Sequence, residues 1–190
     1  MTLFTKSALP KAALIAGLLA AAATSLTAPA FAATGPITEA EVTAAEAEWA
    51  KGIVHVGDVF TQGGDYKTAA SDLIDAMYGY QDGTVLFKPT KAAVDEFRET
   101  KDQALSYFVG GGEPEDHGFA ITPWSAVRFD NKGMVIDADS ATVMGNYYFT
   151  NAKTGQDVKV DFSMGFKRAP SDGHLELFLH HSSLPYEPAH

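Results

Sequence analysis

The sequence predicts an α+β domain in which helices come first and a curved antiparallel sheet follows. Apolar residues recur at helical spacing in the first half of the chain. The second half holds four runs rich in β-branched and aromatic residues, separated by turns of hairpin length. Helices followed by an antiparallel meander are typical of α+β domains. A curved sheet wrapped over the helices would form a cone whose mouth holds a ligand.

Three helices are predicted. The first begins at the capping box of Thr38 and Glu41, whose side chains each satisfy an unpaired backbone amide, and it ends at Gly63. The second covers residues 66–78, with its apolar residues on one face. The third is short, begins at a cap at Thr100, and is stopped by three consecutive glycines.

The predicted strands begin with a short one over residues 84–87. The four longer runs cover residues 119–130, 135–150, 158–168 and 174–183. The turns between them are expected at residues 131–133, 151–155 and 170–173. The second long run is long for one strand, so a bend is expected near Gly145.

Residues 1–32 have the pattern of a secretory signal peptide. Lys6 and Lys11 precede an apolar run, and Ala30 and Ala32 supply the small residues that a signal peptidase reads. Threonine and serine interrupt the run before it reaches the ~20 residues of a membrane span, which argues against an anchor. We therefore expect a periplasmic or secreted protein that consists of one α+β domain, residues 33–190.

The charge of the expected mature domain excludes several classes of partner. Without Lys6 and Lys11 the chain has 12 basic and 24 acidic residues, a net charge of −12. Such a surface repels nucleic acid and anionic lipid, so neither nucleic acid nor membrane is expected as a partner. The chain has no cysteine, which excludes thiolate catalysis and cysteine-ligated metals.

The last predicted strand ends in polar residues. Because side chains alternate along a strand, His181 and Ser183 share a face with Leu175, Leu177 and Leu179. An apolar wall that ends in an imidazole and a hydroxyl suits a small pocket with a few polar groups. The alternative is that both residues only satisfy hydrogen bonds where the strand frays. The spacing leaves these two interpretations open.

No metal site can be read from the histidine pattern. A zinc site needs imidazoles that converge at known spacings. The adjacent His180 and His181 point to opposite faces of a regular strand, and the others are scattered. We expect no metal ligand and no cofactor, although a manganese or zinc site assembled in space is left open. Two hydroxyls stand out instead: Thr90 follows a strand and a proline, and Tyr107 lies on the short helix, where a core aromatic is the alternative interpretation.

Two segments resemble the iota class of carbonic anhydrases. They are Met144-Gly145-Asn146-Tyr147-Tyr148-Phe149-Thr150 and His180-His181-Ser182-Ser183-Leu184-Pro185-Tyr186, and the similarity spans most of residues 65–186. This family is related to the association domain of the calmodulin-dependent kinase. The resemblance implies the cone-shaped, cystatin-like fold of the nuclear transport factor 2 superfamily. It also implies an enzyme, a carbonate dehydratase that reversibly hydrates carbon dioxide to bicarbonate. Some members work without metal by holding bicarbonate with hydroxyl groups, and others are linked to manganese.

The resemblance also implies a set of site residues. The family's pocket threonine, tyrosine and serine fall on Thr90, Tyr107 and Ser183, with Ser182 beside them in contact with the substrate. Their hydroxyls would stabilise the charge that develops on the oxygens of carbon dioxide. His181, on the same side as Ser183, would be the general base. A bulge before Ser182 would reverse this assignment.

Two other functions fit the same residues. One is a non-catalytic module that binds a small ligand in the periplasm. The other is an oligomerisation module, because association domains of this fold assemble through their sheets. With either function or with catalysis, a homodimer or a higher homo-oligomer is expected.

Overall fold

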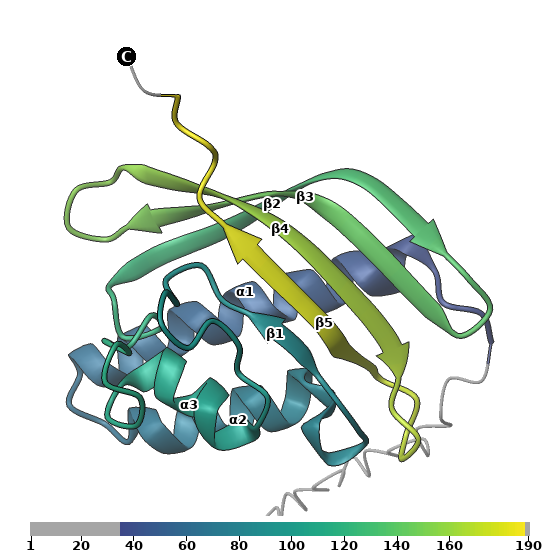
Figure 1. Ribbon diagram of the computed structural model, residues 1–190, viewed down its shortest axis with the longest axis horizontal. Coiled ribbons are helices and arrows are strands. Elements are labelled where there is room, and N and C mark those ends of the chain that lie inside the picture. The colour runs from purple at the N-terminus through teal and green to yellow at the C-terminus, as the bar shows by residue number, and fades with distance from the viewer. Residues whose placement is uncertain (1–34, 189–190) are drawn as a thin grey trace, which may run out of the picture. The chain divides into compact units, whose positions relative to one another are not determined.

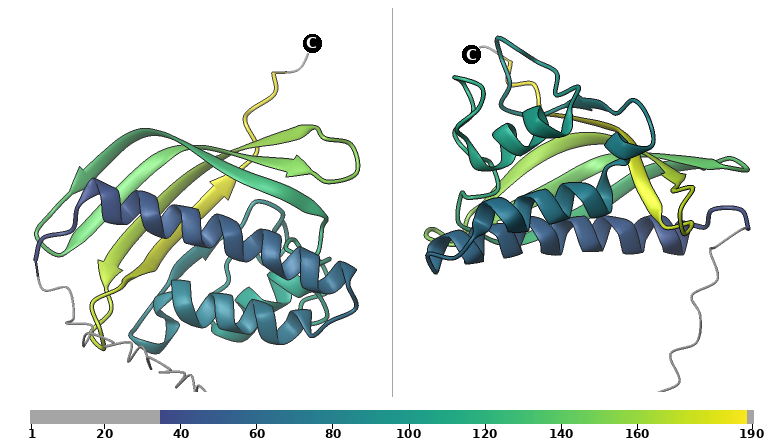
Figure 2. Two further views of the ribbon diagram at one scale, coloured as in Figure 1. Left: turned by 180° about the vertical axis from the view of Figure 1, so that it is seen from behind. Right: turned by 90° about the horizontal axis from the view of Figure 1, so that it is seen from below.

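The computed structural model describes residues 35–188, and the predicted signal peptide lies outside these residues. Three α-helices and a 3-10 turn lie against one face of a curved, unclosed five-stranded sheet (Figures 1 and 2). The elements are α1 (Glu39–Thr61), α2 (Tyr66–Met77), η1 (Gly79–Gln81), β1 (Leu86–Lys88), α3 (Lys101–Val109), β2 (Trp124–Ile136), β3 (Ser140–Asn151), β4 (Asp157–Arg168) and β5 (Leu175–Ser183). The predicted α+β class and the order of its halves are confirmed. None of the helices in residues 35–188 is long and apolar enough to cross a membrane.

The helices begin where their caps predict. Thr38 accepts a hydrogen bond from the Glu41 amide, and the Glu41 carboxylate accepts one from the Thr38 amide. Thr100 and Gln103 form the same reciprocal pair at the start of α3. One face of α1 is buried against the sheet, because its apolar residues recur every three or four positions.

The sheet is mixed, and this corrects the antiparallel prediction. Strands β2 to β5 form the expected antiparallel meander, but β1 pairs in parallel with β5 at the edge, so the strand order is β1-β5-β4-β3-β2. The register places Leu86 opposite Leu179 and Lys88 opposite His181. The chain that leaves β1 therefore runs beside the polar end of β5.

The predicted turn at residues 131–133 is wrong, because these residues lie inside β2. The strand continues to Ile136, and the chain turns at residues 137–139. Asn131 pairs with Gly145 of β3 and Gly133 pairs with Met144, so the register shifts between them. Residues 131–133 therefore form a bulge-like irregularity inside the strand pair rather than a turn. A Cβ at Gly145 would collide with the Asp130 carbonyl oxygen, which explains the glycine there.

A second irregularity changes the faces of β5. Gly165 pairs with Leu179 and Phe166 pairs with Leu177, so Phe178 is an extra residue on β5. A Cβ at Gly165 would lie 2.7 Å from the Phe178 ring, so the glycine leaves room for the bulge. Beyond Phe178 the alternation is reversed.

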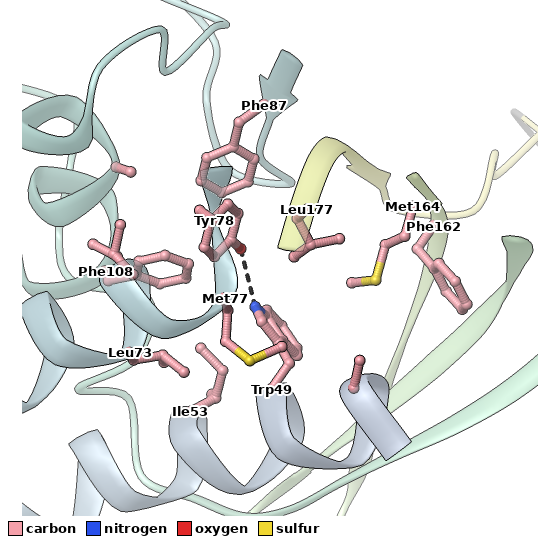
Figure 3. Close-up of a cluster of buried hydrophobic side chains, with 14 of the residues drawn as sticks. Trp49, Ile53, Leu73, Met77, Tyr78, Phe87, Phe108, Phe162, Met164 and Leu177 are labelled. Atoms are coloured by element: carbon pink, nitrogen blue, oxygen red, sulfur yellow. Dashed lines mark hydrogen bonds between the residues drawn. The ribbon is translucent and has the colours of Figure 1, made fainter. Parts of the chain in front are cut away.

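The core gathers around Trp49 of α1. Its ring stacks on Tyr147 at a centroid distance of 5.8 Å and meets Phe149 edge-on at 6.3 Å. Its indole N–H donates to the Tyr78 hydroxyl at 2.9 Å, as the dashed line in Figure 3 shows. Leu177 points into the same cluster from β5 (Figure 3). Trp49 thus joins the helices to the inner face of the sheet.

Candidate functional site

The inner face of β5 carries a buried histidine. His180 is 1% exposed and packs against the rings of Trp49 and Phe87. Its Nδ1 lies 2.8 Å from the Tyr78 hydroxyl, and its Nε2 lies 3.4 Å from the Tyr147 hydroxyl. Both ring nitrogens therefore face tyrosine hydroxyls inside the core.

The partners of His180 determine its protonation. The indole of Trp49 can only donate, so the Tyr78 hydroxyl accepts from it and keeps its own proton to donate to Nδ1. We assign the proton of the neutral imidazole to Nε2, which faces Tyr147, because this tautomer leaves Nδ1 free to accept from Tyr78. Burial, with a smaller contribution from His181, lowers the pKa of His180 to about 3, so the ring is neutral near pH 7.

Four hydroxyl groups meet beside the end of β5, two residues beyond His180. They belong to Thr90, Tyr107, Tyr147 and Ser182. Thr90 Oγ1 donates to Ser182 Oγ at 2.8 Å, and Ser182 is 3% exposed. Burial raises the pKa of Tyr107 well above its usual value, and contacts with the Lys91 backbone and the Thr90 side chain oppose this increase. Burial likewise raises the pKa of Tyr147, opposed by Ser182 and Thr90. Both phenols therefore stay protonated and can donate hydrogen bonds.

Parallel pairing and a fastened loop place Thr90 beside Ser182. Strand β1 ends opposite His181, and the chain continues through the buried Pro89 to Thr90. The loop that follows is held by Glu115, whose carboxylate accepts hydrogen bonds from the amides of Ala93, Val94 and Asp95 at 2.8, 3.1 and 2.9 Å.

A buried ion pair fastens the end of the same loop. The guanidinium of Arg98 is fully buried and lies 2.6 Å from the Asp116 carboxylate. Asp116 also accepts a hydrogen bond from Ser106 of α3 at 2.7 Å. A buried charge needs such partners, because an unpaired one is costly. The loop that carries Thr90 is therefore tied to α3, which carries Tyr107.

A cavity of about 90 Å³ lies beside Tyr107. Phe119 and Thr122 contribute to its wall, and Lys91, Glu115 and His117 line it from the loops. One water molecule takes up about 30 Å³ in the liquid, so the cavity holds a few waters or one small molecule. A small ligand at this position lies beside the ring of Tyr107.

The structure brings Thr90, Tyr107 and Ser182 together, and it separates them from His181 and Ser183. The prediction that His181 and Ser183 lie on the inner leucine face is wrong, because the bulge at Phe178 reverses the alternation. His181 is exposed on the outer face, where it lines a hollow with Lys132 and Met144, and Ser183 lines the same hollow.

Sequence reasoning missed His180, Tyr78 and Tyr147 as members of the site. A usable signal was Gly165 in the neighbouring strand, since an isolated glycine in a strand indicates a bulge. Within residues 35–188, no group of three or more histidine, aspartate or glutamate side chains is placed to hold a metal ion. The polar atoms of the site are hydroxyls and one neutral imidazole.

Comparison with known proteins points to one family. The sequence profile of the metal-independent carbonic anhydrases matches residues 40–184. A curated metal-independent carbonic anhydrase from Nostoc sp. (strain PCC 7120 / SAG 25.82 / UTEX 2576) is 42% identical over 156 residues, which cover 80% of this chain and 75% of the relative. The crystal structure of a cyanobacterial iota-carbonic anhydrase in complex with bicarbonate matches with a TM-score of 0.77 and 40% identity. That match covers 80% of this chain and 95% of the other.

Two more distant structures show the fold alone. The calcium/calmodulin-dependent protein kinase II association domain from Xanthomonas campestris matches with a TM-score of 0.54 and 24% identity, over 83% of this chain and 96% of the other. A nuclear transport factor 2-like protein with a cystatin-like fold from Novosphingobium aromaticivorans matches with a TM-score of 0.51 and 13% identity, over 79% of this chain and 83% of the other. The nuclear transport factor 2-like, cystatin-like fold implied by the sequence is thereby confirmed.

The neutral state of His180 predicts a pH-dependent stability. The unfolded chain binds a proton at this histidine near pH 6.5, whereas the folded chain binds it only near pH 3. Stability from this group is therefore complete above pH 6.5 and is lost as the pH falls toward 3, by up to ~1.4 kcal/mol per pH unit. Urea unfolding between pH 7 and 5 should show this slope in the wild type and in His181→Gln, but not in His180→Gln. Parallel curves for the wild type and His180→Gln would refute the assignment.

Proposed function

The chain belongs to the metal-independent carbonic anhydrase family, and we propose that its reaction takes place among the hydroxyl groups of Thr90, Tyr107 and Ser182. The reaction is the reversible hydration of carbon dioxide to bicarbonate, so the chain is an enzyme rather than a non-catalytic binding module. The observation that carries the proposal is the hydroxyl cluster of Thr90, Tyr107 and Ser182, of which Tyr107 lines a cavity of about 90 Å³. The bicarbonate complex of the cyanobacterial structure supports bicarbonate as the ligand.

Hydroxyl donors suit the charge that this reaction develops. Carbon dioxide is small and apolar, and aromatic rings such as those of Phe119 and Tyr107 offer it a compatible wall. When the oxygen of water attacks the carbon, negative charge builds on the oxygens of carbon dioxide. The Tyr107 hydroxyl keeps its proton, because burial raises its pKa, and it can donate to that charge together with Thr90 and Ser182.

His180 acts in this proposal as a positioning residue. Its low pKa prevents it from keeping a proton at neutral pH, so it is a poor general base. Its Nε2–H is directed at Tyr147, which in turn contacts Ser182 and Thr90. His180 therefore orients the Tyr147 hydroxyl, and through it the hydroxyls of Ser182 and Thr90. The exposed His181 and the outward Ser183 have no role in the proposed site.

We propose in addition that two copies of the chain associate through the outer face of the sheet. Val135 and Met144 are 64% and 58% exposed on this face, and Met144 lines an outer hollow of about 330 Å³. Light scattering of the purified chain at micromolar concentration should give the mass of a dimer or a larger assembly, because apolar surface of this kind is buried on association. Met144→Lys should lower that mass, and Val94→Lys, a change at an exposed loop position, should not. A monomer mass for the wild type would contradict the proposal.

Export remains a proposal that rests on the pattern of residues 1–32. The periplasmic fraction of a bacterium that expresses the full chain should contain protein that begins at Ala33. Its intact mass gives the answer directly. Protein that retains residues 1–32, or that is found only in the cytoplasm, would contradict export.

Adjacent serines provide the test of the proposed site. Ser182→Ala should lower kcat for carbon dioxide hydration by about 10²- to 10³-fold, because it removes one group that holds the developing charge. Ser183→Ala changes a serine on the outer side and should stay within a few-fold of the wild type. Stopped-flow hydration on chelator-treated protein measures both. Loss of activity in Ser183→Ala with Ser182→Ala unaffected would overturn the site, and activity that needs added manganese or zinc would overturn the hydroxyl mechanism.

A further inference from the structure

Hydration releases a proton that has to leave the site. The water oxygen forms a bond to carbon, one O–H bond of that water breaks, and the products are bicarbonate and H⁺. The buried groups of the site are poor acceptors. Burial raises the pKa of both Tyr107 and Tyr147, so their phenols are already protonated, and it lowers the pKa of His180 to about 3. The acceptor must therefore lie closer to solvent.

The cavity beside Tyr107 leads to such a group. Tyr107 is 5% exposed, and His117, which lines the same cavity, is an exposed residue. The volume of about 90 Å³ accommodates the few waters that would carry a proton between them. Histidine is the side chain suited to exchange protons with solvent near neutral pH.

The backbone around His117 is fixed relative to the site. Its neighbours Asp116 and Gly118 are buried, and Asp116 is tied to Arg98 and Ser106. Gly118 has a φ of +81°, and a Cβ there would lie 2.5 Å from the Ile121 side chain. The Phe119 amide donates to the Tyr107 carbonyl at 2.9 Å, which pins this loop to α3. An imidazole that reaches solvent is thus held on a rigid segment beside Tyr107.

The other charged side chains that line the cavity either have hydrogen-bond or ion-pair partners or cannot accept a proton. The carboxylate of Glu115 accepts hydrogen bonds from three backbone amides, which lower its pKa. Asp116 is paired with the buried Arg98. Lys91 is a cation and has no free site for a proton. The exposed imidazole of His117 is therefore the lining group that remains to carry a proton between the cavity and solvent.

We propose that His117 accepts the proton released by hydration, through water in the cavity, and passes it to buffer in solution. This inference rests on the proposed function of the Thr90, Tyr107 and Ser182 site. In the dehydration direction His117 returns a proton along the same route.

The test separates proton release from the chemical step. Stopped-flow hydration at low and high buffer concentration measures net turnover, which requires proton release. Exchange of ¹³C between carbon dioxide and bicarbonate at equilibrium, followed by NMR, requires the chemical step without net proton release. Both are measured on the wild type, on His117→Ala, on Ser182→Ala and on His55→Ala, which removes an exposed histidine of α1.

We expect kcat of His117→Ala at low buffer to be lower by about 10²-fold, the lower end of the range for a lost acid–base group. Its kcat/KM and its equilibrium exchange should match the wild type, and added imidazole should restore kcat. His55→Ala should behave as the wild type throughout. Wild-type kcat in His117→Ala at low buffer would overturn the proposal, as would a loss that also appears in equilibrium exchange and resists imidazole. Wild-type exchange in Ser182→Ala would instead refute the proposed site.

Discussion

The extra residue in β5 determines which polar side chains reach the interior. Leu177 and His180 both point inward although they are three positions apart, because Phe178 bulges out of the ladder opposite Gly165. Without the bulge, Leu179 would lie opposite Met164 in the place of His180, and His181 would lie opposite Phe162 in the place of Ser182. One added residue therefore selects the histidine and the serine that enter the site. Natural bulges often redirect side chains next to functional sites, and this one has that effect.

A chain of hydrogen bonds connects the core to the hydroxyl cluster. It runs from the indole of Trp49 through Tyr78 to His180 and on to Tyr147. Each link satisfies a polar group that would otherwise be buried without a partner, at a cost of about 1–3 kcal/mol. The aromatic rings around the chain exclude water, so the same groups hold one neutral imidazole and protonated phenols. The site is thus an extension of the core packing, with its donors fixed before a substrate arrives.

Much of the fold could be predicted from local patterns. The capping boxes at Thr38 and Thr100 and the helical periodicity of α1 depend on neighbouring residues, and they gave the right elements. The parallel pairing of β1 could not be predicted, because three residues that pair with a strand some 90 positions away leave no periodic signal. The resemblance to a known family pointed to Thr90 and Tyr107, and the structure brings these two side chains into contact.

The main error of the sequence-based prediction was the assignment of faces along β5, because alternation of side chains assumes a strand without a bulge. The bulge depends on the contact between Gly165 of β4 and Phe178 of β5, so it cannot be predicted from the residues of β5 alone. The same limit hid His180, whose partner Tyr78 lies 102 residues earlier in the chain.

Cysteine reactivity provides the most direct test of the register on which the site depends. The natural chain has no cysteine, so Ser182→Cys and Ser183→Cys each introduce one thiol with little change in side-chain size. The rate of labelling by a soluble thiol reagent under native conditions compares the two positions. The structure predicts fast labelling of Ser183→Cys and slow labelling of Ser182→Cys, with equal rates once the chain is unfolded. Fast labelling at 182 and protection at 183 in the folded protein would contradict the account.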